Sequence, residues 1–157
     1  MAGKSLQQEL GKKKPFESPE KEAMLNIARA SDQFQNTFGK LFRSFGLTGS
    51  QHNVLRILRG AGDEGLPTLA IRDRMIDEGS TVTRLLDKLE QAGFVTRDRS
   101  RPDRRQVLCR ITAQGEALLA QLDPTMDSAD TEAMAVLNEA SMAQLIELLA
   151  SVRMGNQ

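Results

Sequence analysis

The sequence predicts a mainly α-helical fold with one small β-hairpin. Over most of the chain, apolar residues recur at three- and four-residue steps, which is typical of amphipathic helices. Glycines and capping residues such as Ser, Thr and Asn divide this pattern into segments of ordinary helix length. The spacing changes only over residues 94–112, where "FVTRDRS" and "QVLCRIT" have β-like patterns on either side of "RPDRR". We therefore expect a two-stranded hairpin that interrupts a series of helices.

The length and composition are those of one globular domain with extra helices for association. The chain has 157 residues, of which 39% are hydrophobic, enough for a packed core. No segment approaches the roughly 18 consecutive apolar residues of a membrane span, and the polar N-terminus lacks the apolar stretch of a secretory signal. A single cysteine fits a reducing compartment. These features predict a cytoplasmic protein that does not enter a membrane.

The first 46 residues are expected to form a flexible segment and one long helix. Residues 1–19 combine glycine, proline and three consecutive lysines, and this basic run is either a solvated tail or an arm that contacts DNA. Residues 20–46 carry an apolar stripe that ends before Gly46 and consists of Met24, Ile27, Phe34, Phe38, Phe42 and Phe45. This stripe either packs on the core or is covered by a second chain.

Three shorter helices are expected next. The first is capped by Thr48 or Ser50, has an apolar inner face and is ended by Gly60 and Gly62. The second covers residues 68–76, after Pro67. A turn at residues 77–79 then leads to "STVTRLLDKLEQAG", which predicts a helix that begins at Ser80 and ends at Gly93.

The last of these helices has one apolar and one polar face. The apolar face holds Val82, Leu89 and either Leu85 or Leu86. The polar side holds hydroxyl groups and two cations, from Ser80, Thr81, Thr83, Arg84 and Lys88. These are groups that bond base edges and phosphates in a major groove, so the two short helices with a tight turn indicate a helix-turn-helix. An ordinary solvated helix face is the alternative.

The predicted hairpin gathers arginines in one short segment of a neutral chain. Residues 97–106, "RDRSRPDRRQ", hold five arginines and two aspartates, a net charge of +3, although the chain has 21 basic and 21 acidic residues. An arginine-rich loop beside a basic helix fits a passing sugar-phosphate backbone, and a narrow minor groove holds arginine well. The candidate contacts are Arg99, Arg101, Asp103, Arg104 and Arg105. Asp103 is expected to hold a nearby arginine by a bidentate pair.

The chain returns to helix after Thr112. Pro124 is expected to kink this helix, and Asn138 to cap a final, strongly apolar one. Residues 111–157 hold seven acidic and one basic side chain, a net charge of −6. The basic middle is therefore followed by an acidic end, and a basic patch attracts polyanions even in a neutral protein.

The stretch "STVTRLLDKLEQAGFVTRDRSRPDRRQVLCRITAQGEALL" resembles the winged helix-turn-helix of MarR-type (multiple antibiotic resistance) bacterial transcriptional regulators. Four features match in order: the helix and strand "TVTRLLDKLEQAGFV", the wing "RPDRR", the strand that ends in "IT", and "AQGEALL" at the start of the next helix. With "LTGSQHNVLRIL" upstream and "LNEASMAQLIELL" downstream, the resemblance covers about residues 25–153.

The resemblance implies an architecture and a function. It implies a winged helix-turn-helix DNA-binding domain at residues 47–112, with dimerisation helices at residues 20–46 and 113–157. It implies a homodimer on a two-fold palindrome of double-stranded DNA. Many members are repressors that small aromatic or phenolic ligands release, so a ligand-responsive repressor is expected. The implied roles place Thr81, Thr83 and Arg84 at the major groove and Arg105, paired with Asp103, in the minor groove.

The chain departs from some members at the implied ligand pocket, which lies between the DNA-binding lobe and the dimer helices. It has no Tyr and no Trp, so aromatic contacts to a ligand must come from phenylalanines such as Phe38 and Phe42. His52 stands where the family often has an aromatic residue. It either lines the pocket or is a satisfied structural group.

Other kinds of chemistry find little support. One histidine and one cysteine cannot build the usual metal site, and Cys109 alternates with Val107 and Ile111, which places it toward the core. No phosphate-binding glycine loop follows a strand. We therefore expect neither an enzyme nor a cofactor. The rival hypothesis is a winged helix that serves as a protein–protein interaction module without sequence-specific DNA binding.

Overall fold

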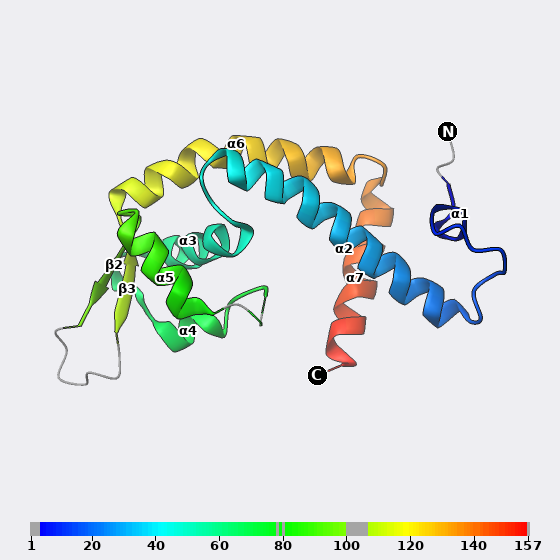
Figure 1. The fold of residues 1–157 in the computed structure, drawn as a ribbon, viewed down its shortest axis with the longest axis horizontal. Coiled ribbons are helices and arrows are strands. Elements are labelled where there is room, and N and C mark those ends of the chain that lie inside the picture. The colour runs from blue at the N-terminus through cyan, green and yellow to red at the C-terminus, as the bar shows by residue number, and fades with distance from the viewer. Residues whose placement is uncertain (1–3, 78, 80, 100–106, 157) are drawn as a thin grey trace.

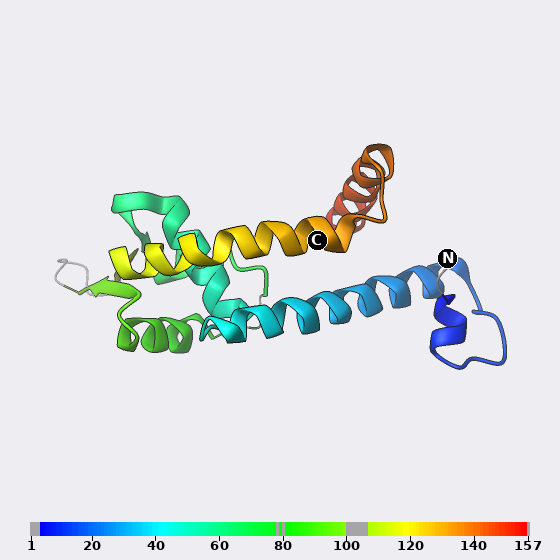
Figure 2. The same cartoon turned by 90° about the horizontal axis from the view of Figure 1, so that it is seen from above.

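The computed structural model describes residues 4–77, 79, 81–99 and 107–156. It contains a lobe of short helices and a small sheet, and two long helices extend from this lobe in the same general direction (Figures 1 and 2). The long helices are α2 (Pro19–Ser44) and α6 (Ala113–Met134). The mainly helical fold with a small hairpin is therefore confirmed.

The first helices begin and end at residues with clear local causes. Ser18 caps α2 by accepting a hydrogen bond from the Lys21 amide, and Gly46 follows the helix with a φ of +73°. Helix α3 (Gly49–Ala61) begins with a capping box, in which Thr48 and Gln51 each bond the other's backbone amide. Thr48, rather than Ser50, is thus the cap, and Gly62 ends the helix.

Two of the short helices differ from their predicted bounds. Helix α4 (Thr68–Arg72) stops four residues early, because the amides of Arg74 and Met75 bond carbonyls three residues back and tighten the chain into a turn. Between α3 and α4 lies a 3₁₀ turn, η1 (Gly62–Glu64). Helix α5 (Val82–Gln91) begins after Thr81, which takes the N-cap position that the sequence suggested for Ser80. Ser80 itself lies outside the described residues.

The sheet has three antiparallel strands, one more than predicted. Strands β2 (Val95–Asp98) and β3 (Leu108–Ile111) form the expected pair, and β1 (Leu66–Pro67) adds on the other side of β3. Gly65 permits this approach, since a Cβ there would lie 2.5 Å from the Cys109 carbonyl oxygen. A two-residue strand that contains a proline lacks the alternating pattern on which strand prediction depends.

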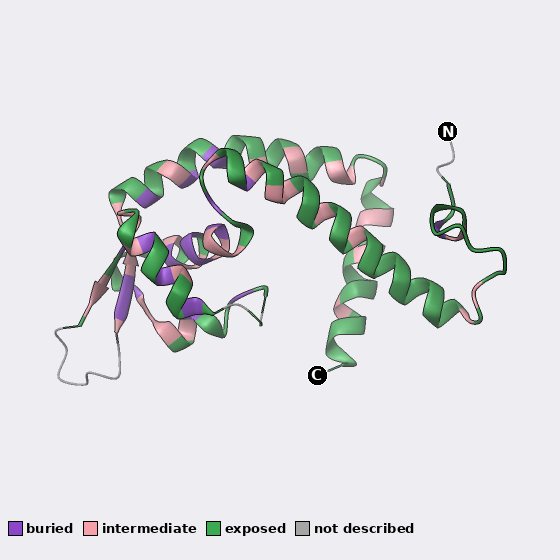
Figure 3. Ribbon diagram, in the orientation of Figure 1, coloured by how far each residue is buried: buried purple, intermediate pink, exposed green. Residues whose placement is uncertain are grey.

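The core lies where α3, α5, α6 and the sheet meet (Figure 3). Leucines and valines of three helices are fully enclosed, among them Leu55 of α3, Leu86 of α5 and Leu119 of α6. Cys109 of β3 joins them, so its predicted inward position is confirmed. This packing fixes α5 against the lobe by its apolar side.

The ends of the chain contain helices outside this core. Helix α6 includes Pro124, at which a kink was expected; Pro124 and Ala120, whose carbonyl loses a partner, are both exposed to solvent. Asn138 caps α7 (Glu139–Met154), as predicted, and none of its residues is buried. The N-terminal segment contains an unpredicted turn of helix, α1 (Leu6–Glu9), with a Ser5–Gln8 capping box.

No single helix among these described residues is both long and apolar enough to cross a bilayer. Only α6 and α7 taken together meet those two criteria, and they meet at a bend of 96°.

Candidate nucleic-acid interface and adjoining cavity

Helix α5 presents its polar side to solvent. Val82, Leu86 and Leu89 are buried against the core, whereas Thr83, Arg84 and Lys88 are exposed. Thr81 is also exposed, and no hydrogen bond of its side chain caps the helix. The spacing of these side chains follows from the helical period, because a buried leucine every three or four residues leaves the intervening positions outside. The exposed groups suit contacts with base edges and phosphates.

Arg97 of β2 is clamped to α5 by two carboxylates. Its Nη2 lies 2.6 Å from Asp87 Oδ1 and 2.5 Å from Glu90 Oε2, and its Nε donates to the same Glu90 oxygen at 2.8 Å. The Arg97 side chain is only 11% exposed. Hydrogen bonds to Arg97 hold the pKa of the Glu90 carboxyl below its ordinary value, so Glu90 stays ionised at neutral pH. The clamp joins the wing strand to the helix that carries Arg84 and Lys88.

The sequence grouped Arg97 with the arginines of the hairpin, but the structure pairs it with two carboxylates of α5. Its position on β2, before the loop, directs it to the acidic side of α5 rather than to solvent. The useful indication was the pair Asp87 and Glu90, since residues three apart lie on one side of a helix. Counting the five arginines of residues 97–106 as one basic patch conceals this role of Arg97.

Only the beginning of the predicted wing can be placed. The Arg99 side chain is 61% exposed, and its Nη2 lies 3.5 Å from Glu90 Oε2. Arg101, Asp103, Arg104 and Arg105 lie outside the described residues, in the sequence between β2 and β3. Their roles at DNA therefore remain predictions from the sequence.

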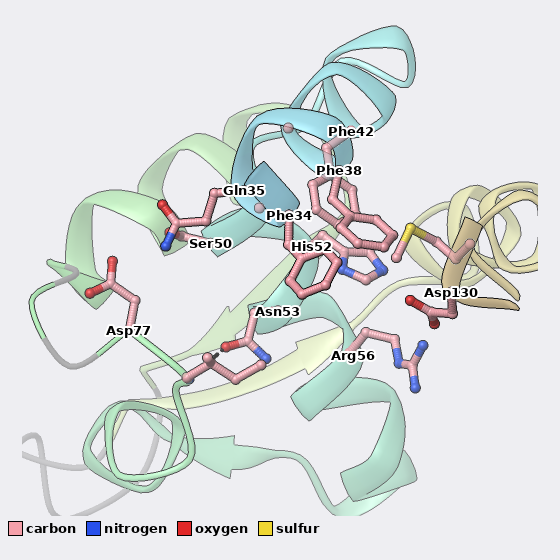
Figure 4. Close-up of a pocket in the computed structure, with 14 residues that line it drawn as sticks. Phe34, Gln35, Phe38, Phe42, Ser50, His52, Asn53, Arg56, Asp77 and Asp130 are labelled. Carbon is pink, nitrogen blue, oxygen red and sulfur yellow. Dashed lines mark hydrogen bonds between the residues drawn. The ribbon is translucent and has the colours of Figure 1, made fainter. Parts of the chain in front are cut away.

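A cavity of about 770 Å³ lies between α2, α3 and α6. Phenylalanines from three successive turns of α2 form one wall, and α3 supplies the opposite wall (Figure 4). Ile76 and Asp77, from the segment between α4 and α5, also line it. The principal lining residues from the long helices and α3 are Phe34, Phe38, Phe42, His52, Asn53, Arg56, Met126 and Asp130. The predicted pocket residues Phe38, Phe42 and His52 are thus brought together.

His52 lies in this cavity with an unusual environment. Its ring stacks on Phe42 with the centroids 4.5 Å apart, and the residue is 8% exposed. Its Nε2 is buried and has no hydrogen-bond partner in the described part of the structure. Burial lowers the pKa of His52, and the neighbouring Arg56 lowers it further, so the ring is neutral at pH 7. His52 therefore lines the cavity, and its ring also packs against the core through Phe42.

An ion pair joins α3, which forms one wall of the cavity, to α6. Arg59 forms a bidentate pair with Asp123 of α6, at 2.6 and 3.1 Å. Arg56, which lines the cavity, has its Nη1 4.0 Å from the same carboxylate. Hydrogen bonds from Arg59 hold the pKa of Asp123 below its ordinary value. The pair thus fixes α3 against α6 near neutral pH.

The remaining candidates for chemistry are absent or enclosed. Among the described residues, no group of His, Cys, Asp and Glu side chains could hold a metal ion. Burial raises the pKa of the Cys109 thiol, which therefore stays protonated and unreactive at neutral pH.

A helix-turn-helix followed by a small antiparallel ribbon, with an exposed basic recognition helix, defines a winged-helix DNA-binding protein. The profile of the MarR family matches residues 47–107. The chain is 32% identical to a MarR transcription factor from Planctomyces limnophilus, with 87% of this chain and 98% of that one covered and a TM-score of 0.68. The protein therefore belongs to the MarR family of transcriptional regulators, which are DNA-binding proteins and not enzymes.

Two further proteins are similar over most of the chain. The HTH-type transcriptional regulator MhqR of Bacillus subtilis (strain 168) is 29% identical over 126 residues, which are 80% of this chain and 86% of MhqR. Bordetella bronchiseptica BpsR was solved in a study of how 6-hydroxynicotinic acid regulates its DNA binding. It has a TM-score of 0.75 at 22% identity, with 84% of this chain and 98% of BpsR covered.

Proposed function

We propose that the protein is a ligand-responsive repressor that binds a palindromic operator as a homodimer. The exposed polar side of α5 carries this proposal: Thr83, Arg84 and Lys88 lie together on a helix whose opposite side is fixed in the core. In this assignment Ser80, Thr81, Thr83, Arg84 and Lys88 meet the major groove. Arg99, Arg101, Arg104 and Arg105 meet the backbone and minor groove, with Asp103 holding Arg105.

The apolar surfaces of α2 and α7 support a homodimer. On α7, Ile146 is 63% and Leu148 57% exposed, and on α2 Met24 is 63% exposed. A helix that is apolar on most sides and buried on none needs a partner. A second copy supplies the same surface and gives the two-fold symmetry that a palindrome requires. Residues 20–46 and 113–157 are thus the proposed dimerisation segments, and residues 47–112 the DNA-binding domain.

The cavity supports a small aromatic ligand. Three phenylalanines provide faces for stacking, and the polar side chains of Asn53, Arg56 and Asp130 line the same space and can bond a polar substituent. The cavity touches both the long helices and the segment before α5, so an occupant there contacts both parts of the molecule. That BpsR is regulated by an aromatic acid supports a regulatory role of this kind. The protein is proposed to act in the cytoplasm, where it meets the chromosome.

A gel-shift assay on the DNA that flanks the gene tests this function. We expect a discrete shifted band. Unlabelled DNA of the same sequence should remove this band, whereas random DNA should not. Addition of 6-hydroxynicotinic acid or a simple phenol then asks whether an aromatic compound releases the DNA. Binding that random DNA competes away as well would favour an interaction module instead of a regulator.

A further inference from the structure

Asn53 joins the wall of the cavity to the segment that leads into the recognition helix. It follows His52 on α3 and lines the same cavity. Its Oδ1 accepts a hydrogen bond of 2.9 Å from the backbone N–H of Ile76, drawn as a dashed line in Figure 4. Ile76 lines the cavity too, and the chain continues from it to Thr81, the N-cap of α5. One amide side chain therefore touches the cavity and the approach to α5 together.

The chain before Ile76 is held by other contacts. The turn after α4 is closed by bonds from the Arg74 and Met75 amides, and the Met75 side chain is buried. The Ile76 side chain is 89% exposed, so packing of this side chain does not hold the residue in place. Among the described residues, the bond from its backbone N–H to Asn53 ties Ile76 to α3.

We propose that Asn53 is a positioning residue that sets where α5 begins relative to α3 and links the contents of the cavity to DNA binding. This inference rests on the proposed function. A ligand that stacks on Phe38 and Phe42 lies beside Asn53, because all three residues line the same cavity. If such a ligand draws the Asn53 amide toward itself, the Ile76 N–H loses its acceptor. The chain that leads into α5, the helix that carries Arg84, then loses one of the contacts that set its position relative to α3.

The bond uses only the acceptor oxygen of the amide, which permits a matched pair of variants. Asn53→Ala removes the acceptor, whereas Asn53→Asp retains it and adds a negative charge. Glu64→Gln is the control, since Glu64 is an exposed residue of η1, outside the cavity, α5 and the proposed dimerisation segments. Each variant is tested without ligand for affinity to an operator selected from random DNA by the wild type, for affinity to non-operator DNA, and for amide exchange at Ile76.

Asn53→Ala is expected to lower operator affinity about tenfold, with non-operator affinity within about twofold and faster exchange at Ile76. Asn53→Asp should keep the Ile76 amide protected and retain most of the operator affinity, despite its added charge. Glu64→Gln should match the wild type.

Wild-type operator affinity in Asn53→Ala would overturn the proposal, as would equal losses on both DNAs or equal losses in the Ala and Asp variants. If the wild type binds no DNA, the proposed function fails first and this inference falls with it. If the wild type binds its operator and only the Asn53 variants behave otherwise than expected, the positioning role alone is wrong.

Discussion

At His52, an imidazole is buried without the hydrogen bond that burial usually requires. An unsatisfied buried polar atom costs about 1–3 kcal/mol, and native proteins keep few of them. The His52 ring lines the cavity among phenylalanines, while Nε2 itself is enclosed by its neighbours. The sequence showed one histidine beside apolar residues, a pattern that suits a structural role equally well. The stacking on Phe42 and the unpartnered Nε2 are features of packing that the sequence could not show.

The lowered pKa of His52 predicts how stability depends on pH. The unfolded chain binds a proton near the ordinary histidine pKa of about 6.5, at which the folded protein still has a neutral ring. The free energy of unfolding is therefore highest above about pH 6.5 and falls as the pH drops toward the folded pKa. Because His52 is the only histidine, His52→Phe should flatten this fall. Urea unfolding at about pH 7.5, 6.5 and 5.5 measures the free energy of unfolding of both proteins. If this free energy depends on pH in the variant as it does in the wild type, the fall does not come from His52.

Arg84 is predicted to provide sequence specificity. It stands exposed on α5, where a guanidinium can bond guanine O6 and N7. Arg84→Ala should cost about 1–3 kcal/mol per half-site on the operator and far less on random DNA. Arg105→Ala, by contrast, should weaken both more evenly, because a minor-groove arginine senses groove width and potential. Fluorescence anisotropy on the two DNAs measures these losses, and an even loss for Arg84→Ala would remove it from base recognition.

Among the elements, α5 and β2 form one unit through Arg97. Its buried guanidinium bridges two carboxylates of the helix, so the wing strand cannot shift without breaking these bonds. Arg97→Gln should lower the free energy of unfolding by about 1–2 kcal/mol, a range reduced for the partial exposure of Asp87 and Glu90. Arg99→Gln is the matched control for stability. Arg99 is mostly exposed, so that change should cost below about 0.5 kcal/mol. If chemical unfolding shows equal losses of unfolding free energy in the two variants, the contacts of Arg97 with Asp87 and Glu90 add no stability beyond that of an exposed ion pair.

The elements also show what sequence patterns can predict. Helices α2, α3, α5 and α7 followed from apolar periodicity and capping residues, which act within a few positions of the chain. Strand β1 did not, because its two residues form a strand only by pairing with β3, some forty positions away. The same holds for the cavity: Phe38 and His52 were candidates, but Asn53, Ile76 and Met126 join them only through the packing of α3 against α2 and α6.

For the whole molecule, the uncovered surface of α7 predicts self-association. Sedimentation at micromolar concentration should give about twice the chain mass of 17.3 kDa. A charge at Leu148, which is mostly exposed in the single chain, should cost a dimer several kcal/mol because an unpaired charge would be buried. Leu148→Glu is therefore expected to sediment as a monomer that remains folded. Leu69→Glu, a similarly exposed leucine on α4, should remain dimeric. Monomeric wild-type protein would contradict the proposed assembly.

Footprinting of the wild-type protein on the DNA fragment that it binds tests the proposed function most directly. A dimer that inserts one α5 per half-site should protect two symmetry-related segments. Their centres should lie roughly one helical turn, or a small multiple of it, apart. The matching guanines should lose protection in Arg84→Ala. A single protected segment, or protection spread evenly along the fragment, would contradict sequence-specific binding by a two-fold dimer.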